Sequence, residues 1–254
     1  MCILAYFCSP KSYHFQTMEY PYRVRYNDVD ADKRLRLYVL ESWLLDTAGL
    51  DSNSHGVGVP YLASQGLGWV LTSLSLEMSC LPTIDDTVNI ESWVSANRHK
   101  TTFRHFRMSL GGSEIGLAKS TWSILDITSR QAVDVFCQEP FRRQPLVEAT
   151  VLRSAEPPFF KKLPEVHGSR QFEILHSHTD FNLHCNSCKY LEFMLDTFQR
   201  PGTEKPFRLD IRYSHELLIG DKITVNYCHT PASTLYEIRT PHDAVACRAI
   251  VSDI

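Results

Sequence analysis

Apolar residues recur at helical spacing in the first part of the chain. Leu37, Leu40 and Leu44 follow one another at three- and four-residue intervals, and Val39 and Trp43 extend the apolar surface around the same stretch. A helix that is apolar over so much of its circumference must be buried on several sides. The pattern therefore predicts a central helix with a sheet wrapped around it.

Stretches with strand character follow this helix, and the same order of elements occurs again later in the chain. The predicted strands of the first set are Trp69–Met78, Thr87–Ala96, Thr102–Leu110 and Ile115–Ile127. The second set has a helix at Leu191–Phe198 and strands at Phe207–Tyr213, Ile223–His229, Leu235–Thr240 and Val245–Val251. One helix cradled by a curled antiparallel sheet, twice over, predicts an α+β fold of the tandem (double) hotdog type.

A sequence repeat supports this duplication. The segment Tyr22–Thr47 aligns without a gap on Phe172–Thr197, with Asp30 on Asp180. A repeated unit of roughly a hundred residues has the usual size of a domain. The sequence therefore predicts an N-terminal tail over residues 1–18, a first hotdog domain over 19–140, a proline-rich linker over 141–164 and a second hotdog domain over 165–254.

Three polar residues distinguish the second copy of the repeat. Asp180, Asn182 and His184 occupy every second position directly ahead of a helix. If this segment is extended, all three side chains lie on one side, and the helix points its free N–H groups at them. The first copy has Asp32 and Arg34 in place of Asn182 and His184, so it keeps one acid and loses the amide and the imidazole. We therefore expect binding in the first domain and chemistry in the second.

Composition limits the possible functions. The net charge of −3 gives no electrostatic case for binding nucleic acid. No apolar run reaches the roughly 18 residues that a membrane-spanning helix needs. The apolar run near the N-terminus has no basic region before it and no small-residue cleavage site, so we expect no signal peptide. With eight cysteines and no secretory signal, we expect reduced thiols and a cytoplasmic location.

Cys185 and Cys188 form a CxxC spacing at the predicted start of the second helix. No second CxxC accompanies this pair, and His184 already belongs to the polar triplet, so a zinc site would lack ligands. We expect two free thiols here, and we expect neither a metal nor a cofactor in the protein.

These motifs resemble the acyl-acyl-carrier-protein thioesterases, the double-hotdog family of plant plastids and bacteria. The second-domain signature of that family, Asp-x-Asn-x-His-x-Asn followed by Lys-Tyr, is similar to the run from Asp180 to Tyr190. A Tyr-x-x-Glu stretch of the family is similar to Tyr213–Glu216. The resemblance implies an enzyme of fatty acid biosynthesis that releases free fatty acid from acyl-acyl-carrier protein, with the acyl chain held by the first domain. Because the short tail is not rich in Ser and Arg, we expect a bacterial-type member.

The chemistry that this reaction needs can be assigned to particular residues. Thioester hydrolysis requires an activated water or an attacking carboxylate, and hydrogen-bond donors for the oxygen that becomes negative. Asn182 and His184 suit the donor and proton-handling roles, and Glu216 is the candidate for water activation. Asp180 either orients these residues or attacks directly. Leu217 stands where the family often has Cys, which excludes a thiol nucleophile at that position.

Other functions on the same scaffold remain as alternatives. An acyl-CoA thioesterase uses the same chemistry. A hotdog hydratase or dehydratase usually has Pro after the Asn, whereas this chain has Leu183. A non-catalytic acyl-binding module would have no use for the acid, amide and imidazole together.

The expected partner is acyl-carrier protein, which resembles a small acidic helical bundle and therefore calls for a basic docking face. The candidate residues for this face are Arg98, Lys100, Arg104, Arg107, Arg142 and Arg143. A tandem hotdog already contains an internal pseudo-dimer, so the chain is expected to be a monomer or a homodimer.

Asn186 is expected to cap the second helix.

Overall fold

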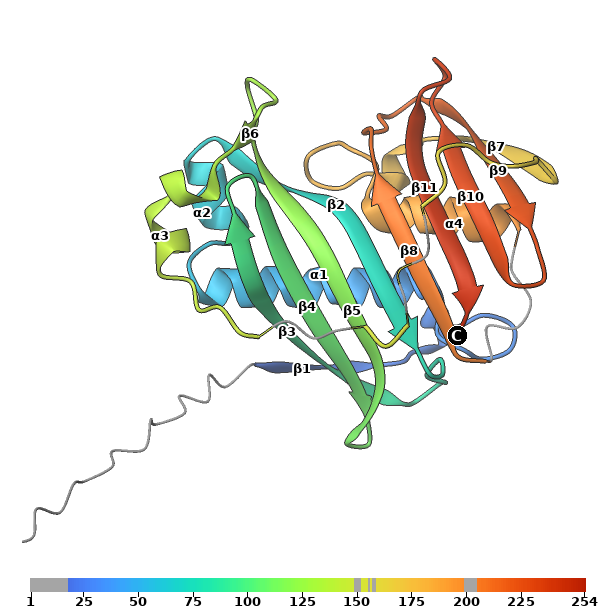
Figure 1. Ribbon diagram of the computed structural model, residues 1–254, viewed down its shortest axis with the longest axis horizontal. Coiled ribbons are helices and arrows are strands. Elements are labelled where there is room, and N and C mark those ends of the chain that lie inside the picture. Colours follow the sequence, from blue (N-terminus) through green and yellow to red (C-terminus); the bar gives the residue numbers. More distant parts are fainter. Residues whose placement is uncertain (1–17, 149–151, 155, 157–158, 199–204) are drawn as a thin grey trace, which may run out of the picture.

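Two copies of one folding unit lie side by side in the molecule (Figure 1). The structure is a computed structural model that describes residues 18–148, 152–154, 156, 159–198 and 205–254. The expected N-terminal tail, apart from its last residue, lies outside these described residues. Each copy has a helix behind an antiparallel sheet, as the hydrophobic pattern predicts.

The first half is built around α1 (Leu37–Ser54). This helix continues beyond its apolar stretch because Asp51 and Ser52 make buried contacts with Arg104 in its last turns. The other elements of this half are β1 (Glu19–Arg23), α2 (Val59–Ser64), β2 (Leu67–Met78), β3 (Thr87–Arg98), β4 (Thr101–Leu110), β5 (Ser113–Asp126), β6 (Ala132–Val133) and α3 (Glu139–Arg142), with short 3-10 helices at Tyr26–Asp28 and Val135–Cys137.

The second half repeats this order around α4 (Ser187–Thr197). Its strands are β7 (Gly168–Glu173), β8 (Phe207–Tyr213), β9 (Lys222–His229), β10 (Ser233–Arg239) and β11 (Val245–Asp253), and a 3-10 helix spans His176–His178. Every strand that the alternation predicts is present. The prediction missed β1 and β7, which are short strands at the two ends of the sheet, the two-residue strand β6, α2 in the insertion of the first half and the short helix α3.

The sheets of the two halves join edge to edge. The strand order is β1-β3-β4-β5-β2-β8-β11-β10-β9-β7 in one 11-stranded sheet, with β6 paired to β5. Strands β2 and β8 are equivalent in the repeat and pair antiparallel at its centre, so the two halves are related by a pseudo-twofold axis. The predicted pair of sheets is therefore one continuous sheet, and both central helices cover the same face of it (Figure 1).

Alternation along β2 and β8 separates an apolar face from a polar face at this junction. Leu76 pairs with Leu209 and points into the core beneath the helices. The neighbouring pairs, Ser75 with Asp210 and Glu77 with Arg208, point to the opposite face. Because successive side chains of a strand point to opposite sides, one registered pairing supplies both a core and a polar seam.

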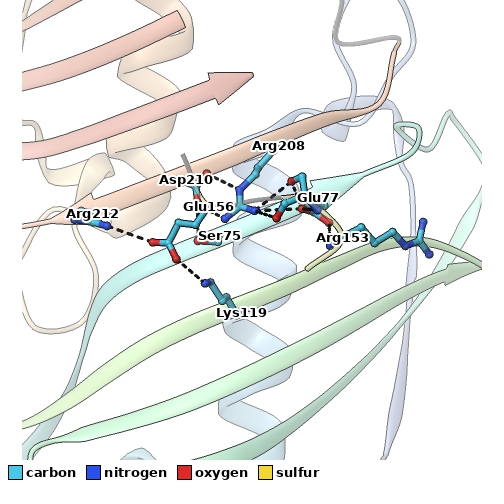
Figure 2. Close-up of polar contacts among 9 residues, drawn as sticks. Ser75, Glu77, Lys119, Arg153, Glu156, Arg208, Asp210 and Arg212 are labelled. Carbon is cyan, nitrogen blue, oxygen red and sulfur yellow. Dashed lines mark hydrogen bonds and ion pairs between the residues drawn. The ribbon is translucent and has the colours of Figure 1, made fainter. Parts of the chain in front are cut away.

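The polar seam is a buried hydrogen-bonded network (Figure 2). Arg208 lies 2.7 Å from Asp210 and 3.3 Å from Glu77, and all three side chains are at most 6% exposed. Ser75 donates to Asp210 over 2.6 Å. Glu77 accepts from the backbone N–H of Ser154, which belongs to the stretch that the sequence predicts as a linker. The linker thus closes the outer side of the seam.

The two central helices share one hydrophobic core and one buried carboxyl. Glu41 of α1 is 1% exposed and accepts a hydrogen bond of 2.6 Å from Tyr213, at the end of β8 in the other half. Its second oxygen has no partner among the described residues. Burial raises the pKa of the Glu41 carboxyl to about 7, against the hydrogen bond from Tyr213, which favours the charged form. No helix in the described part of the chain is long and apolar enough to cross a membrane.

The polar seam predicts a large effect of removing Arg208. Arg208→Ala leaves two buried carboxylates without their cation, so the free energy of unfolding should fall by about 3–5 kcal/mol. The matched control is Arg23→Ala, which breaks an exposed ion pair with Asp85 and should cost less than about 1 kcal/mol. Urea denaturation of both variants measures the difference, and equal losses would contradict the role assigned to the seam.

Glu41 predicts a pH dependence of stability. Since its folded pKa of about 7 lies above the ordinary value of 4.5, the folded protein holds this proton more tightly than the unfolded chain. The stabilisation is complete below pH 4.5 and is lost as the pH rises through 7, by up to roughly 3 kcal/mol. Glu41→Gln should therefore gain stability over the wild type as the pH rises. Unfolding measured from pH 4.5 to 8 tests this, and parallel curves would refute it.

Candidate active site

Asp180 closes a tight turn ahead of α4. Its backbone N–H donates to the carbonyl of His184 over 2.8 Å, and its carboxylate oxygen Oδ1 accepts the backbone N–H groups of Asn182 (2.8 Å) and His184 (3.3 Å). Leu183 adopts the left-handed region with φ 63°. The extended conformation that would have aligned the polar triplet is therefore wrong, and a turn held by a side-chain oxygen brings these residues together instead.

The same turn is present in the first half. The Asp30 carboxylate accepts the backbone N–H groups of Asp32 (2.9 Å) and Arg34 (3.0 Å), and Lys33 has φ 62°. The repeat is therefore kept in backbone geometry as well as in sequence. Since Asp30 performs this task without an amide or an imidazole beside it, the turn-closing role of an aspartate is separable from chemistry.

The side chains of the Asp180 turn differ in their exposure. Asn182 is exposed at the tip of the turn, and His184 is 30% exposed. Asn186 is the N-cap of α4, as predicted, and accepts the backbone N–H of Cys188 over 3.0 Å. The Asn186 side chain thus occupies the N–H group of Cys188, one of the helix N–H groups that we expected to face the site. The side-chain amide of Asn182 is therefore the clearer hydrogen-bond donor for a substrate oxygen.

A second loop runs beside this turn and carries Glu216. The backbone N–H of Cys185 donates to Leu217 over 2.8 Å, and His184 pairs with Leu218 in an isolated bridge. These backbone contacts bring Oε2 of Glu216 to 3.5 Å from Nε2 of His184. That separation suits an ion pair and is slightly longer than a direct hydrogen bond. The structure therefore brings together two of the predicted site residues from segments far apart in sequence.

The corresponding loop of the first half lacks the acid. There the backbone N–H of Leu35 donates to Pro82 over 2.8 Å, which is the counterpart of the contact between Cys185 and Leu217. The position equivalent to Glu216 is then Leu81, which is buried. The first half thus keeps the turn and replaces the carboxylate of the second loop with an apolar side chain.

One further residue contacts Glu216 and carries no signal in the sequence. Arg130 lies in the loop after β5 of the first half, and its Nη2 contacts Oε1 of Glu216 in the second half. Glu216 therefore lies between a guanidinium and an imidazole. No local pattern marks Arg130 as a site residue, because its contact depends on how the two halves pair.

The CxxC cysteines are free and buried. Burial raises the pKa of the Cys185 thiol to about 12, and it raises the pKa of Cys188 as well. Metal binding and redox exchange need the thiolate, which burial disfavours at both positions. No group of His, Cys, Asp or Glu within the described ranges is arranged to hold a metal ion.

One of the basic residues proposed for a docking face cannot serve there. Arg104 is 4% exposed and forms a 2.6 Å ion pair with Asp51, so its positive charge is compensated by a buried carboxylate inside the first half. Arg107 is partly covered and pairs with Glu91 and Glu114. The other candidates, Arg98, Lys100, Arg142 and Arg143, are exposed, and the last two both pair with the exposed Glu139.

The site contains the groups that an acyl-transfer hydrolysis needs. The imidazole of His184 and the carboxylate of Glu216 can hold and move a proton. The exposed amide of Asn182 can donate to an oxygen that becomes negative. All of these groups lie on loops fixed by backbone hydrogen bonds, which is the arrangement expected of a preorganised site.

Comparisons with known proteins agree with this geometry. The family model described as the acyl-ACP thioesterase N-terminal domain matches residues 15–139, and the model of the C-terminal domain matches residues 161–252. A search of the curated proteins by sequence finds no match.

Solved structures share the architecture at low sequence identity. An acyl-ACP thioesterase from Bacteroides thetaiotaomicron is 22% identical with a TM-score of 0.78, over 92% of this chain and 96% of that one. A putative oleoyl thioesterase from Lactobacillus plantarum is 21% identical with a TM-score of 0.79, over 93% and 95%. A 12:0-ACP thioesterase from Umbellularia californica is 16% identical with a TM-score of 0.81, over 93% and 96%.

These likenesses confirm the double hotdog fold, and the two family models together cover most of the sequence. The chain therefore belongs to the acyl-acyl-carrier-protein (acyl-ACP) thioesterase family and is a thioester hydrolase.

Proposed function

We propose that Asp180, Asn182, His184 and Glu216 form the active site at which this enzyme hydrolyses fatty acyl-ACP to free fatty acid. The observation that carries this assignment is the pair formed by His184 and Glu216, 3.5 Å apart beside the turn that presents Asn182. In this assignment His184 and Glu216 accept the proton, Asn182 donates a hydrogen bond, and Asp180 holds the turn. The reaction needs water and no cofactor.

In this mechanism the His184–Glu216 pair takes a proton from water as its oxygen bonds to the thioester carbonyl carbon. The carbonyl oxygen becomes negative and accepts a hydrogen bond from the Asn182 amide. The carbon–sulfur bond then breaks, and the sulfur leaves with a proton returned by His184. The products are the fatty acid and the free thiol of the carrier, so atoms and charges balance.

Asp180 acts in this proposal through the turn that it closes. One oxygen of its carboxylate already accepts the backbone N–H groups of Asn182 and His184, the two residues to which this mechanism assigns the donor and proton-transfer roles. That task favours an orienting role over direct attack. Trapping a labelled acyl group on Asp180 would instead establish the alternative in which this carboxylate is the nucleophile.

The division of labour between the halves follows from their differences. We propose that residues 19–140 form a domain that holds the acyl chain, that 141–164 link the halves, and that 165–254 form the catalytic domain. Leu81 and Arg34 occupy the positions of Glu216 and His184, which supports a binding role for the first half. Since the halves already pair through β2 and β8, we infer that the chain does not need a second copy to complete its sheet.

The partner and the compartment are inferred from charge and thiol chemistry. We propose that an acidic carrier docks on the exposed cations Arg98, Lys100, Arg142 and Arg143. The backbone N–H of Val135 donates a hydrogen bond of 2.7 Å to the carbonyl of His99. This bond connects the turn that carries Arg98 and Lys100 to the segment after β6. We further propose a cytoplasmic location, because the cysteines of the described residues are free thiols.

An assay with two carriers tests this function. Purified enzyme should release free thiol from acyl-ACP faster than from acyl-CoA, and the preference should shrink with rising salt, because exposed charges are screened within about 8 Å at physiological ionic strength. A preference for CoA would identify the alternative carrier, and a changed double bond without thiol release would identify a hydratase.

His184→Ala should lower the rate on both substrates by roughly 10²-fold or more.

The duplicated turn supplies an internal control for Asp180. Asp30→Ala and Asp180→Ala remove equivalent hydrogen bonds, so each should cost about 0.5–2 kcal/mol of stability. Only Asp180→Ala should lower turnover, by about 10²-fold or more, since only its turn carries Asn182 and His184. Thermal melts and turnover assays on both variants make the comparison, and equal losses of turnover would mean that both halves contribute chemistry.

A further inference from the structure

The loop that carries Arg130 is ordered by its own hydrogen bonds. The carboxylate of Asp126 accepts the backbone N–H groups of Thr128 (3.0 Å) and Ser129 (2.7 Å), and the N–H of Arg130 donates to the Asp126 carbonyl over 2.9 Å. Arg130 itself has φ 58°, in the left-handed region that residues with a side chain adopt rarely. These bonds fix the backbone of the loop at Arg130 and therefore the point from which its side chain extends.

The loop is also anchored to the sheet of the first half. The backbone N–H of Asp126 donates to Gln131 over 3.0 Å, and the N–H of Ile127 donates to Gly66 over 3.0 Å, just before β2. Strand β2 in turn pairs with β8, and Glu216 follows β8 in the chain. The position of Arg130 relative to Glu216 is therefore set by the strand pairing that joins the halves.

The carboxylate of Glu216 has two different neighbours. Oε1 contacts Nη2 of Arg130, and Oε2 lies 3.5 Å from Nε2 of His184. A free glutamate side chain samples many rotamers, and fixing one of them costs conformational entropy. A guanidinium that binds one carboxylate oxygen leaves the other directed at the imidazole.

We propose that Arg130 is a positioning residue for the reaction, which binds one carboxylate oxygen of Glu216 and directs the other at His184. This proposal rests on the proposed role of Glu216 in hydrolysis. It assigns a residue of the first half to the active site of the second. Removing a cation from contact with a carboxylate disfavours the charged form, so Arg130 also bears on the acidic side of the pH profile.

A simple surface ion pair is the alternative to this role. Arg130 is 45% exposed and Glu216 is 39% exposed, and exposed pairs contribute little to stability. An effect on catalysis that greatly exceeds any effect on stability would therefore separate the two interpretations. Direct docking of the carrier by Arg130 is a second alternative, and it would change KM rather than kcat.

The test compares Arg130→Gln, Arg130→Lys and Glu216→Gln with the double variant Arg130→Gln/Glu216→Gln on acyl-ACP. Arg130→Gln should lower kcat by about 10- to 100-fold with less than about a twofold change in KM, and should move the acidic limb of kcat/KM to higher pH. Arg130→Lys, which keeps the charge, should recover part of the loss. The double variant should be no slower than Glu216→Gln alone, since Arg130 acts through Glu216.

The control is Arg23→Gln, which removes another exposed arginine that pairs with a carboxylate in the same half, and it should leave kcat unchanged. Thermal melts of all variants exclude unfolding as the cause. Multiplicative losses in the double variant, or a rise in KM with unchanged kcat, would overturn the role of Arg130 while leaving that of Glu216 intact. Normal turnover of Glu216→Gln would instead overturn the proposed role of Glu216 and, with it, that of Arg130.

Discussion

The pairing of β2 with β8 is the constraint on which the rest of the structure depends. It turns two sheets into one, places α1 and α4 against each other on a common face and builds the polar seam around Arg208 on the opposite face. Because side chains alternate along a strand, a shift of one residue in this register would place the charged side chains of the seam in the apolar core and the core side chains in the polar seam. The same register also brings a loop of the first half to Glu216. Stability and the geometry of the site therefore have a common origin.

Duplication allows structural and chemical roles to be told apart within one chain. Asp30 and Asp180 close the same turn with equivalent hydrogen bonds, so the carboxylate at this position has a structural task in both halves. What distinguishes the second half is the set of side chains placed on that scaffold. His184 and Glu216 replace Arg34 and Leu81 without a change in fold, and we propose that this pair handles the proton in hydrolysis.

A buried carboxyl lies between the two halves of the molecule. Glu41 of α1 and Tyr213 of β8 form a buried hydrogen bond across the two halves, next to the helix that begins after His184. Burial keeps the pKa of Glu41 near 7, so this carboxyl is easily neutralised and its cost to the core is smaller than that of a fixed charge. The helix pair thus tolerates an acid where the equivalent residue of the second half is Leu191.

The sequence by itself determined the duplicated α+β fold, the strands that alternate clearly and the residues Asp180, Asn182, His184 and Glu216 as candidates for the site. These features follow from periodicity, from the repeat and from the resemblance of local motifs, all of which can be read along the chain. The edge strands β1 and β7 were missed, since short and half-exposed strands carry a weak alternation. Local sequence also suggested an extended segment at Asp180, where side-chain hydrogen bonds impose a turn. Only the tertiary structure decided that Arg104 is buried and that Arg130 meets Glu216, because both contacts join segments far apart in the chain through the packing of sheet and helix.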